Sequence, residues 1–267
     1  MKRYRVKPGA KIDLGKFDAG STAAFKGSKK KADERLLELT RKLEKLQEAL
    51  WAEHRHKVLI VLQGMDTSGK DGTISHVFEG VNPQGVQVAS FKTPMQAELD
   101  HDFLWRVHPK VPGKGEIVIF NRSHYEDVLA VRVKRLAPPG VWRPRYDQIN
   151  DFERLLAETG TVILKFFLHI DKDEQKKRLQ ARLDDPAKRW KFRKGDLDDR
   201  ALWLDYMAAY EEALARTSQK WAPWYIVPAN KKWYRNLVVA TVLVEALESL
   251  DIEIPEPEED LADVVIE

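Results

Sequence analysis

The chain has 267 residues, of which 43% are hydrophobic and 33% are charged, and its charges nearly cancel to a formal net charge of +3. This length and hydrophobic content predict a globular protein with a substantial core, whereas the net charge says little about partners. The absence of cysteine excludes disulfides, thiolate nucleophiles and zinc–thiolate sites.

Residues 1–30 carry nine lysines and arginines against two acids, with scattered glycines. We predict a basic N-terminal arm that is poorly ordered or draped over the surface, either as a solvated tail or facing a polyanion. No apolar run follows its first basic residues, so it does not resemble a secretory signal. The longest apolar runs elsewhere have the size of a strand and are too short to span a bilayer. The sequence therefore predicts a cytoplasmic protein with no membrane partner.

A predicted helix follows the arm and carries leucines at three- and four-residue spacing, a stripe typical of a core or oligomer face: Leu36, Leu39, Leu43, Leu46 and Leu50. Strands then alternate with helices. The predicted strands cover residues 58–62, 86–91, 116–120, 161–168 and 225–227. The predicted helices lie near residues 96–108, 124–135, 145–159, 172–184, 198–218 and 231–249.

This alternation predicts one doubly wound α/β domain over residues 31–250, with a parallel sheet of about five strands and helices on both faces. The nearly continuous apolar runs VLIVL and TVILKFFL are what a sheet buried on both faces requires. Residues 251–267 contain eight acids and no base. We expect them to form an acidic C-terminal tail that is mobile or lies across a basic surface.

The first predicted strand leads directly into Gly64-x-x-x-x-Gly69-Lys70. Such a loop between a strand and a helix is typical of phosphate binding, because the glycines let backbone N–H groups converge on an anion at the positive end of the helix dipole. The residue after the lysine is Asp71 rather than the usual Ser or Thr that holds Mg²⁺. Asp66 and Asp71 are therefore the nearest candidates for the metal, and the alternative is a glycine-rich turn without chemistry. The expected phosphate-binding residues are Gly64, Thr67, Ser68, Gly69 and Lys70.

The segment EIVIF-NRSHYED is a second candidate site, since a buried strand delivers polar groups to the carboxyl edge of the sheet. Arg122 fits a guanidinium that clamps a phosphate. Asn121, the first residue after the strand, is neutral, and the carboxylates come later as Glu126 and Asp127, with Asp127 a further metal candidate. The alternative is helix capping by Asn121 or Ser123, with Glu126 placed as in a capping box.

A third signal is the basic concentration from residue 176 to residue 194, where nine lysines and arginines face two acids. We predict a helical lid over about residues 182–197 that closes over phosphates. The alternatives are a solvated helix face or, because Trp190 and Phe192 lie among the charges, a nucleic-acid surface. The charge density exceeds what one nucleoside triphosphate needs and favours a longer polyanion. The residues of this basic segment expected to bind it are Arg178, Arg182, Lys188, Arg189 and Arg193.

In combination, the blocks QGMDTSGKDG, FNRSHYEDVL, DDPAKRWKF and APWYIVPANKKWYRNL resemble the polyphosphate kinase 2 family over about residues 30–250. The resemblance implies a P-loop kinase-like, three-layer fold related to thymidylate kinase, with inorganic polyphosphate as donor, an adenine nucleotide as acceptor and Mg²⁺ (or Mn²⁺) as cofactor. It implies central roles for Asp66, Lys70 and Arg122, and a homodimer or homotetramer. The N-R-S-H-Y-E-D version, with Glu126, resembles the subgroup that phosphorylates both AMP and ADP. Many relatives have Asp in place of Asn121, so no metal role is expected there.

The sequence thus predicts a phosphotransferase that moves the terminal phosphoryl group of polyphosphate onto AMP and ADP by in-line transfer, with no nucleic-acid partner. The catalytic candidates are Asp66, Lys70, Arg122, Glu126 and Asp127. Two alternatives stay open at this point. One is an ATP-dependent nucleotide or nucleoside kinase of the thymidylate-kinase type, and the other is a polyanion-binding protein that is not an enzyme.

Overall fold

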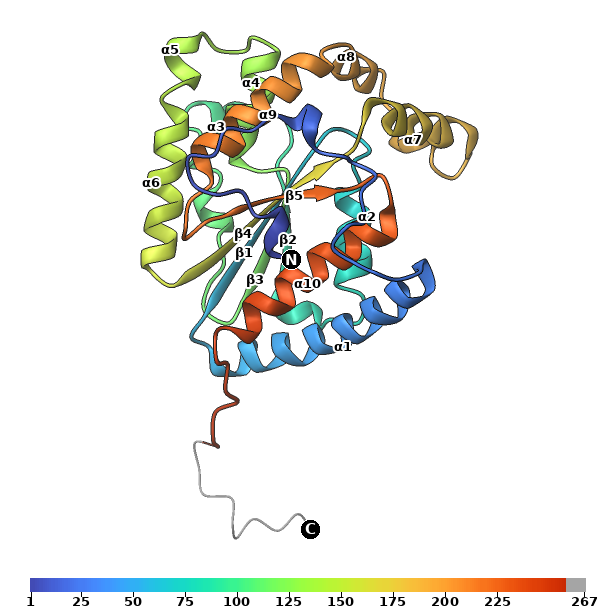
Figure 1. The fold of residues 1–267 in the computed structure, drawn as a ribbon. Helices are drawn as coiled ribbons and strands as arrows, with labels where there is room; N and C mark the ends of the chain where they lie inside the picture. Colours follow the sequence, from blue (N-terminus) through green and yellow to red (C-terminus); the bar gives the residue numbers. More distant parts are fainter. Residues whose placement is uncertain (258–267) are drawn as a thin grey trace.

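The computed structural model describes residues 1–257, and its centre is a five-stranded sheet with the order β2-β3-β1-β4-β5 (Figure 1). The strands are β1 (Lys57–Gln63), β2 (Val86–Ser90), β3 (Ile117–Asn121), β4 (Thr161–His169) and β5 (Trp224–Pro228). All four pairings are parallel, so the carboxyl ends of the strands meet at one edge. The predicted α/β class and parallel sheet are confirmed.

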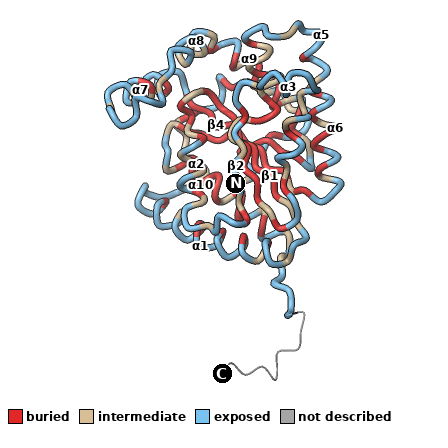
Figure 2. Tube along the Cα trace, turned by 180° about the vertical axis from the view of Figure 1, so that it is seen from behind, coloured by how far each residue is buried: buried red, intermediate tan, exposed pale blue. Residues whose placement is uncertain are grey.

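The three central strands are buried on both faces, which explains their continuous apolar sequences. Figure 2 shows this buried centre in red beneath an exposed shell of helices and loops. The edge strand β2 is the exception, and its Val88 is half exposed.

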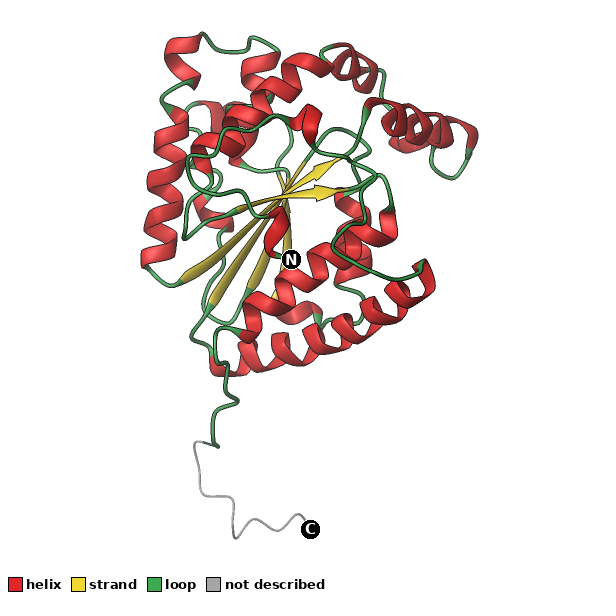
Figure 3. Cartoon of the chain, viewed as in Figure 1, coloured by secondary structure: helices red, strands yellow, loops and turns green. Residues whose placement is uncertain are grey.

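Helices cover both faces of the sheet (Figure 3). On one face α10 (Lys232–Glu248) packs against α1 (Lys29–Glu53) and α2 (Lys70–Val77). On the other face α6 (Arg145–Glu158) packs against α9 (Trp203–Thr217) and β4. The leucine stripe of α1 contributes to the core, because Leu39, Leu43 and Leu50 are fully buried and α1 lies along α10. The core interpretation of the stripe is therefore confirmed, and an oligomer face is not needed to explain it.

At the carboxyl edge, α7 (Lys172–Asp184) and α8 (Gly195–Ala201) project from the body and are joined by a loop with one short turn, η6 (Arg189–Lys191) (Figure 1). This projecting region includes the predicted lid. The remaining α-helices are short: α3 (Gln96–Leu99), α4 (Ala130–Val133) and α5 (Pro139–Trp142). The other 3-10 turns are η1 (Lys2–Tyr4), η2 (Leu14–Lys16), η3 (Pro83–Gly85), η4 (His108–Lys110) and η5 (His124–Asp127).

Two predicted helices were too long. Only Gln96–Leu99 is α-helical in the segment 96–108, because its apolar residues Phe103, Leu104 and Val107 reach the core from successive turns. The segment 124–135 divides into η5 and α4. Spacing at three and four residues does not distinguish such turns from a continuous helix.

The basic arm is ordered, so the prediction of a poorly ordered tail is wrong and that of a surface-draped segment is right. Tyr4, Val6 and Leu14 are buried, and the Val6 N–H donates to the Trp224 carbonyl oxygen (2.8 Å). The arm thereby covers the free edge of β5, which protects it from pairing with other chains. Most of the predicted acidic tail lies outside the described residues. Within residues 1–257, no helix is both long and apolar enough to cross a membrane.

Candidate active site

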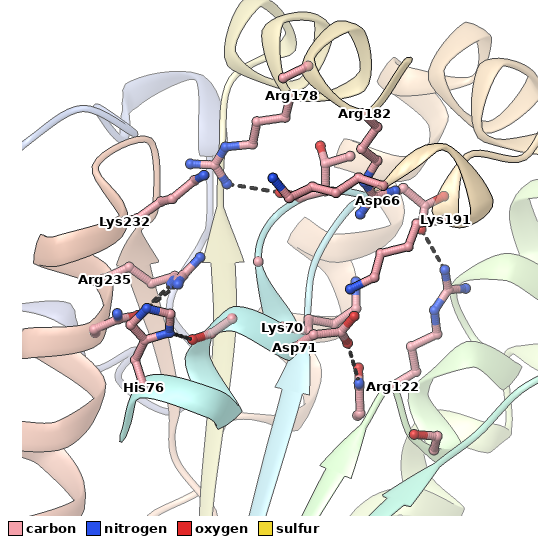
Figure 4. A pocket seen from close by; sticks show the side chains of 18 of the residues that line it. Asp66, Lys70, Asp71, His76, Arg122, Arg178, Arg182, Lys191, Lys232 and Arg235 are labelled. Carbon is pink, nitrogen blue, oxygen red and sulfur yellow. Dashed lines mark hydrogen bonds and ion pairs between the residues drawn. The ribbon is translucent and has the colours of Figure 1, made fainter. Parts of the chain in front are cut away.

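A cavity of about 670 Å³ lies at the carboxyl edge of the sheet, between the loop after β1, the ends of β2 and β3, helix α7 and the start of α10 (Figure 4). Its walls combine many basic side chains with two acidic ones. The basic residues are Lys70, Lys92, Arg122, Arg178, Arg182, Lys188, Lys191, Lys232 and Arg235, and the acids are Asp66 and Asp71. The wall is thus built for a polyanion.

The predicted phosphate-binding loop joins β1 to α2, and two of its glycines are required by its geometry. A Cβ at Gly64 would lie 2.8 Å from the Leu168 carbonyl oxygen. Gly69 has φ +104°, and a Cβ there would lie 1.7 Å from Nη1 of Arg235. Neither position accommodates a side chain, so the loop stays close to β4 and α10.

Side chains of α7 bind the carbonyl groups of the loop. Arg178 donates to the carbonyl oxygens of Thr67 (2.9 Å) and Ser68 (3.1 Å), and Gln175 donates to that of Asp66 (3.2 Å). The first N–H groups of α2 have no acceptor within the helix. Loop and helix therefore present donors to the cavity, as an anion site requires.

Lys70 is buried at the mouth of this loop, where its Nζ donates to the carbonyl oxygens of Gly64 (2.8 Å) and Met65 (3.3 Å). Burial, and then the positive charge of Arg122, lower the pKa of Lys70 to about 8. An anionic ligand would favour the ammonium form and raise this pKa again.

Arg122 faces the loop from the end of β3. Its Nη2 donates to Oδ1 of Asp66 at 2.5 Å, and its Nη1 lies 3.9 Å from Oε2 of Glu126. Glu126 also accepts from the Gln63 amide (3.1 Å). Burial alone would lower the pKa of Arg122, but the charges of Glu126 and Asp66 outweigh it and raise the pKa. Arg122 is therefore permanently cationic, and Glu126 supports it from behind the cavity wall.

Two residues of the same segment lie elsewhere. Asp127 forms an ion pair with Arg145 (2.9 Å) and is not part of the cavity wall. Burial raises the pKa of Asp127 although Arg145 opposes it. His124 is fully buried and bonded to Glu153 (3.2 Å), and it does not line the cavity. Ser123 caps η5 by accepting from the Tyr125 N–H (3.2 Å), as the capping interpretation predicted.

The carboxylates of the cavity fit a magnesium ion that is held mainly by its substrate. Residues 1–257 contain no cluster of three or more His, Cys, Asp or Glu side chains able to hold a metal. Mg²⁺ usually takes one or two carboxylates, substrate phosphates and water. Asp66 and Asp71 both line the cavity, and Asp71 accepts from the Asn121 amide (2.7 Å). A metal role for Asp127 stays a prediction that this geometry does not support.

The lid residues divide into two groups. Arg178, Arg182 and Lys188 line the cavity, as does Lys191. Arg189 turns back to the Leu183 carbonyl oxygen (2.6 Å). Neither Arg189 nor Arg193 belongs to the cavity wall of the described chain. Their role in binding the donor stays a prediction.

Arg235 was not predicted, although it lies directly beneath the phosphate-binding loop. Its side chain is 2% exposed and donates to Oδ1 of Asn236 (2.7 and 3.0 Å) and weakly to the Ser68 carbonyl oxygen (3.4 Å). No carboxylate pairs with it among residues 1–257. Burial, and then the charge of Arg178, lower the pKa of Arg235 to about 9. A buried, uncompensated guanidinium facing a cavity indicates a site for an anion.

A sequence signal for this residue existed. Arg235 stands in a helix whose other positions from Tyr234 to Val244 are almost all apolar, and a charge on such a helix must be paired or serve a site. Lys232, one turn earlier, also lines the cavity, and burial lowers its pKa.

Comparison with known proteins agrees with this geometry. The family model of polyphosphate kinase 2 matches residues 26–255. The chain belongs to the polyphosphate kinase 2 family. It is 61% identical to the AMP/ADP-polyphosphate phosphotransferase of Meiothermus ruber over the full length of both chains. It is 47% identical to the ADP-polyphosphate phosphotransferase of Rhodopseudomonas palustris, over 96% of this chain and 92% of the relative.

A solved structure of a family member has the same fold. The crystal structure of polyphosphate kinase 2 from Arthrobacter aurescens superimposes with a TM-score of 0.94 at 46% identity, covering 98% of this chain and 93% of that one. The predicted family and its P-loop kinase-like fold are confirmed.

Proposed function

We propose that this chain transfers the terminal phosphoryl group of inorganic polyphosphate onto AMP and ADP, forming ADP and ATP. One observation carries the proposal: nine basic side chains against two acids line one cavity around the phosphate-binding loop. Of these nine, Lys70, Lys92, Lys191, Lys232 and Arg235 have no carboxylate partner within residues 1–257. This excess of positive charge suits a long condensed phosphate better than a single nucleoside triphosphate.

The distribution of charge supports an orientation for the two substrates. Six of the basic residues lie on α7, on the lid loop and on α10, and we place the polyphosphate chain along them. Ser90, Phe91 and Lys92 line the opposite end of the cavity, beside Arg122, where we place the phosphate of the nucleotide. The terminal phosphoryl group then lies between them, against the loop amides and Lys70.

The residues act by positioning and by charge. Phosphoryl transfer has a loose transition state whose charge spreads over the transferred oxygens, so cations fixed in advance stabilise it. Lys70 and Arg122 supply this charge from opposite sides, and Asp66 orients Arg122. The acceptor is already an anion, so no general base is required. Asp66 and Asp71 would hold Mg²⁺, with Mn²⁺ as a second candidate, and the ion would supply positive charge that neutralises the phosphates.

A transfer assay tests the proposal. AMP or ADP, polyphosphate and Mg²⁺ are incubated with the protein without added ATP, and nucleotide products are separated. We expect ADP and ATP to form, and Lys70→Ala to lower turnover more than tenfold, while Lys114→Ala, an exposed lysine outside the cavity, retains it. Product formation only when ATP replaces polyphosphate would instead support an ATP-dependent kinase. A cytoplasmic location and a homodimeric or homotetrameric assembly stay predictions, the latter open to light scattering.

A further inference from the structure

A fully buried ion pair connects β4 to α6, and no step of the proposed transfer uses it. Lys165 and Glu153 are both inaccessible to solvent and contact each other directly. Nζ of Lys165 also donates to the hydroxyl of Tyr125 (2.8 Å) and to the carbonyl oxygen of Thr217 (2.8 Å). Every donor of the ammonium group is thus occupied inside the protein.

The same carboxylate holds the turn η5 from within. Oε1 of Glu153 accepts from the Tyr125 hydroxyl (2.8 Å) and from Nε2 of His124 (3.2 Å). His124 and Tyr125 are the first two residues of the turn and are both fully buried. Nδ1 of His124 has no partner within the described chain, so the bond to Glu153 alone orients the ring by hydrogen bonding.

The backbone just before this turn is in an unfavourable conformation. Arg122 has φ +60°, in the left-handed region that residues other than glycine rarely adopt. Such a conformation persists only where neighbouring structure fixes it. A turn of four residues is too short to fix it alone, whereas two side chains anchored on Glu153 can. The guanidinium of Arg122 then reaches Asp66 in the phosphate-binding loop.

We propose that Lys165 and Glu153 are positioning residues, which act through Tyr125 and His124 to hold Arg122 in the backbone conformation that aims its guanidinium at the transferred phosphoryl group. That the guanidinium faces a transferred phosphoryl group rests on the proposed function. Stability alone does not account for the pair, because replacing a buried ion pair by apolar residues of similar size is often neutral or stabilising.

The decisive variant is Tyr125→Phe. Changing Lys165 or Glu153 alone leaves a buried charge without its partner and endangers folding. Tyr125→Phe keeps the pair and removes one of the two side-chain hydrogen bonds that tie the turn to Glu153. The matched control is Tyr4→Phe, because the buried hydroxyl of Tyr4 bonds to that of Tyr234 (2.5 Å) outside the cavity wall.

Two readouts are needed. In the protein without substrates, we expect amide hydrogen exchange of peptides covering residues 120–130 to become about tenfold faster, as for the loss of one hydrogen bond. We expect kcat to fall about tenfold and KM for polyphosphate to change less than about twofold, because the other cavity residues still bind the donor. Tyr4→Phe is expected to change neither the exchange of these peptides nor kcat.

Unchanged exchange in Tyr125→Phe overturns the proposal, and so does faster exchange with an unchanged kcat. An equal loss of kcat in Tyr4→Phe also overturns it, because the effect is then general. If the parent protein transfers no phosphate, the proposed function fails. The exchange comparison then still decides whether the network holds the turn.

Discussion

Replacing Arg235 by methionine should make the free protein more stable and the donor complex weaker. Burial lowers the pKa of this guanidinium from its ordinary value above 12 to about 9. Each pKa unit corresponds to about 1.4 kcal/mol, so the buried charge disfavours the folded state by about 5 kcal/mol. The side chain is cationic at pH 7 in both the folded and unfolded states, so the full penalty is present there.

The methionine also loses favourable contacts. Arg235 forms two good hydrogen bonds to Asn236 and a weak one to Ser68, each worth about 1 kcal/mol or less. The balance is a gain of about 2–3 kcal/mol, or about 6–9 °C in Tm for a chain of this size. A charged partner lost from a phosphate contact costs about 1.5–3 kcal/mol, so KM for polyphosphate should rise at least about tenfold.

Thermal unfolding at pH 7 with and without polyphosphate checks both effects, because a ligand that binds only the folded state raises Tm. We expect a higher Tm for Arg235→Met alone and a smaller increase on adding donor. Arg132→Met is the control, since Arg132 pairs with Glu212 (2.6 Å) outside the cavity and should lose stability while keeping the donor effect. A lower Tm for free Arg235→Met, or a donor effect equal to that of the parent, would refute the reasoning.

Two further experiments examine the cavity. The proposed function requires the ammonium form of Lys70 to bind phosphate, and burial lowers the pKa of Lys70 to about 8. We therefore expect kcat/KM for polyphosphate to be level below pH 8 and to fall above it. Lys70→Arg keeps the positive charge and should remove this fall in kcat/KM. Coincident pH profiles of the parent and of Lys70→Arg would contradict the assignment of the fall to Lys70. In the lid, replacing both Lys188 and Lys191 by Ala should raise KM for long polyphosphate more than KM for tripolyphosphate. The salt dependence of KM for long polyphosphate should also become weaker, because binding then releases fewer counterions. Replacing both Arg189 and Arg193 by Ala should have the smaller effect, because they lie outside the cavity wall. An equal rise in KM for long polyphosphate and for tripolyphosphate in the Lys188 and Lys191 double variant would remove the lid from the mechanism.

The sheet was predictable because the burial of a strand determines which residues occur within that short stretch of sequence. Strands covered on both faces are continuous apolar runs, and the run of β1 leads into a loop whose glycines are required by contacts with β4 and α10. The prediction of a helix over residues 96–108 was wrong because the apolar residues of this segment have helical spacing although they belong to separate turns.

The site was predictable where its residues follow a strand in sequence, and less so where they arrive from a distant helix. Lys70 and Arg122 stand just beyond β1 and β3, so the parallel topology alone brings them together. Arg235 comes from α10, the last helix, and which side of that helix meets the loop after β1 depends on how α10 packs against α2. Residue spacing does not carry that information.

Asp71 and Asn121 are bonded to each other at the carboxyl edge of the sheet. The Asn121 amide donates to one oxygen of Asp71 at 2.7 Å, a distance at which a carboxylate at position 121 would place two negative charges in contact. Because the hydroxyl usual after the lysine is replaced here by a carboxylate, the charge at this end of the cavity comes from α2, and β3 supplies a neutral donor. The amide also orients Asp71, which leaves its second carboxylate oxygen available to a metal bound with the donor phosphates. One carboxylate charge and one neutral amide therefore lie together at this end of the cavity, where the proposed function would place a magnesium–phosphate complex.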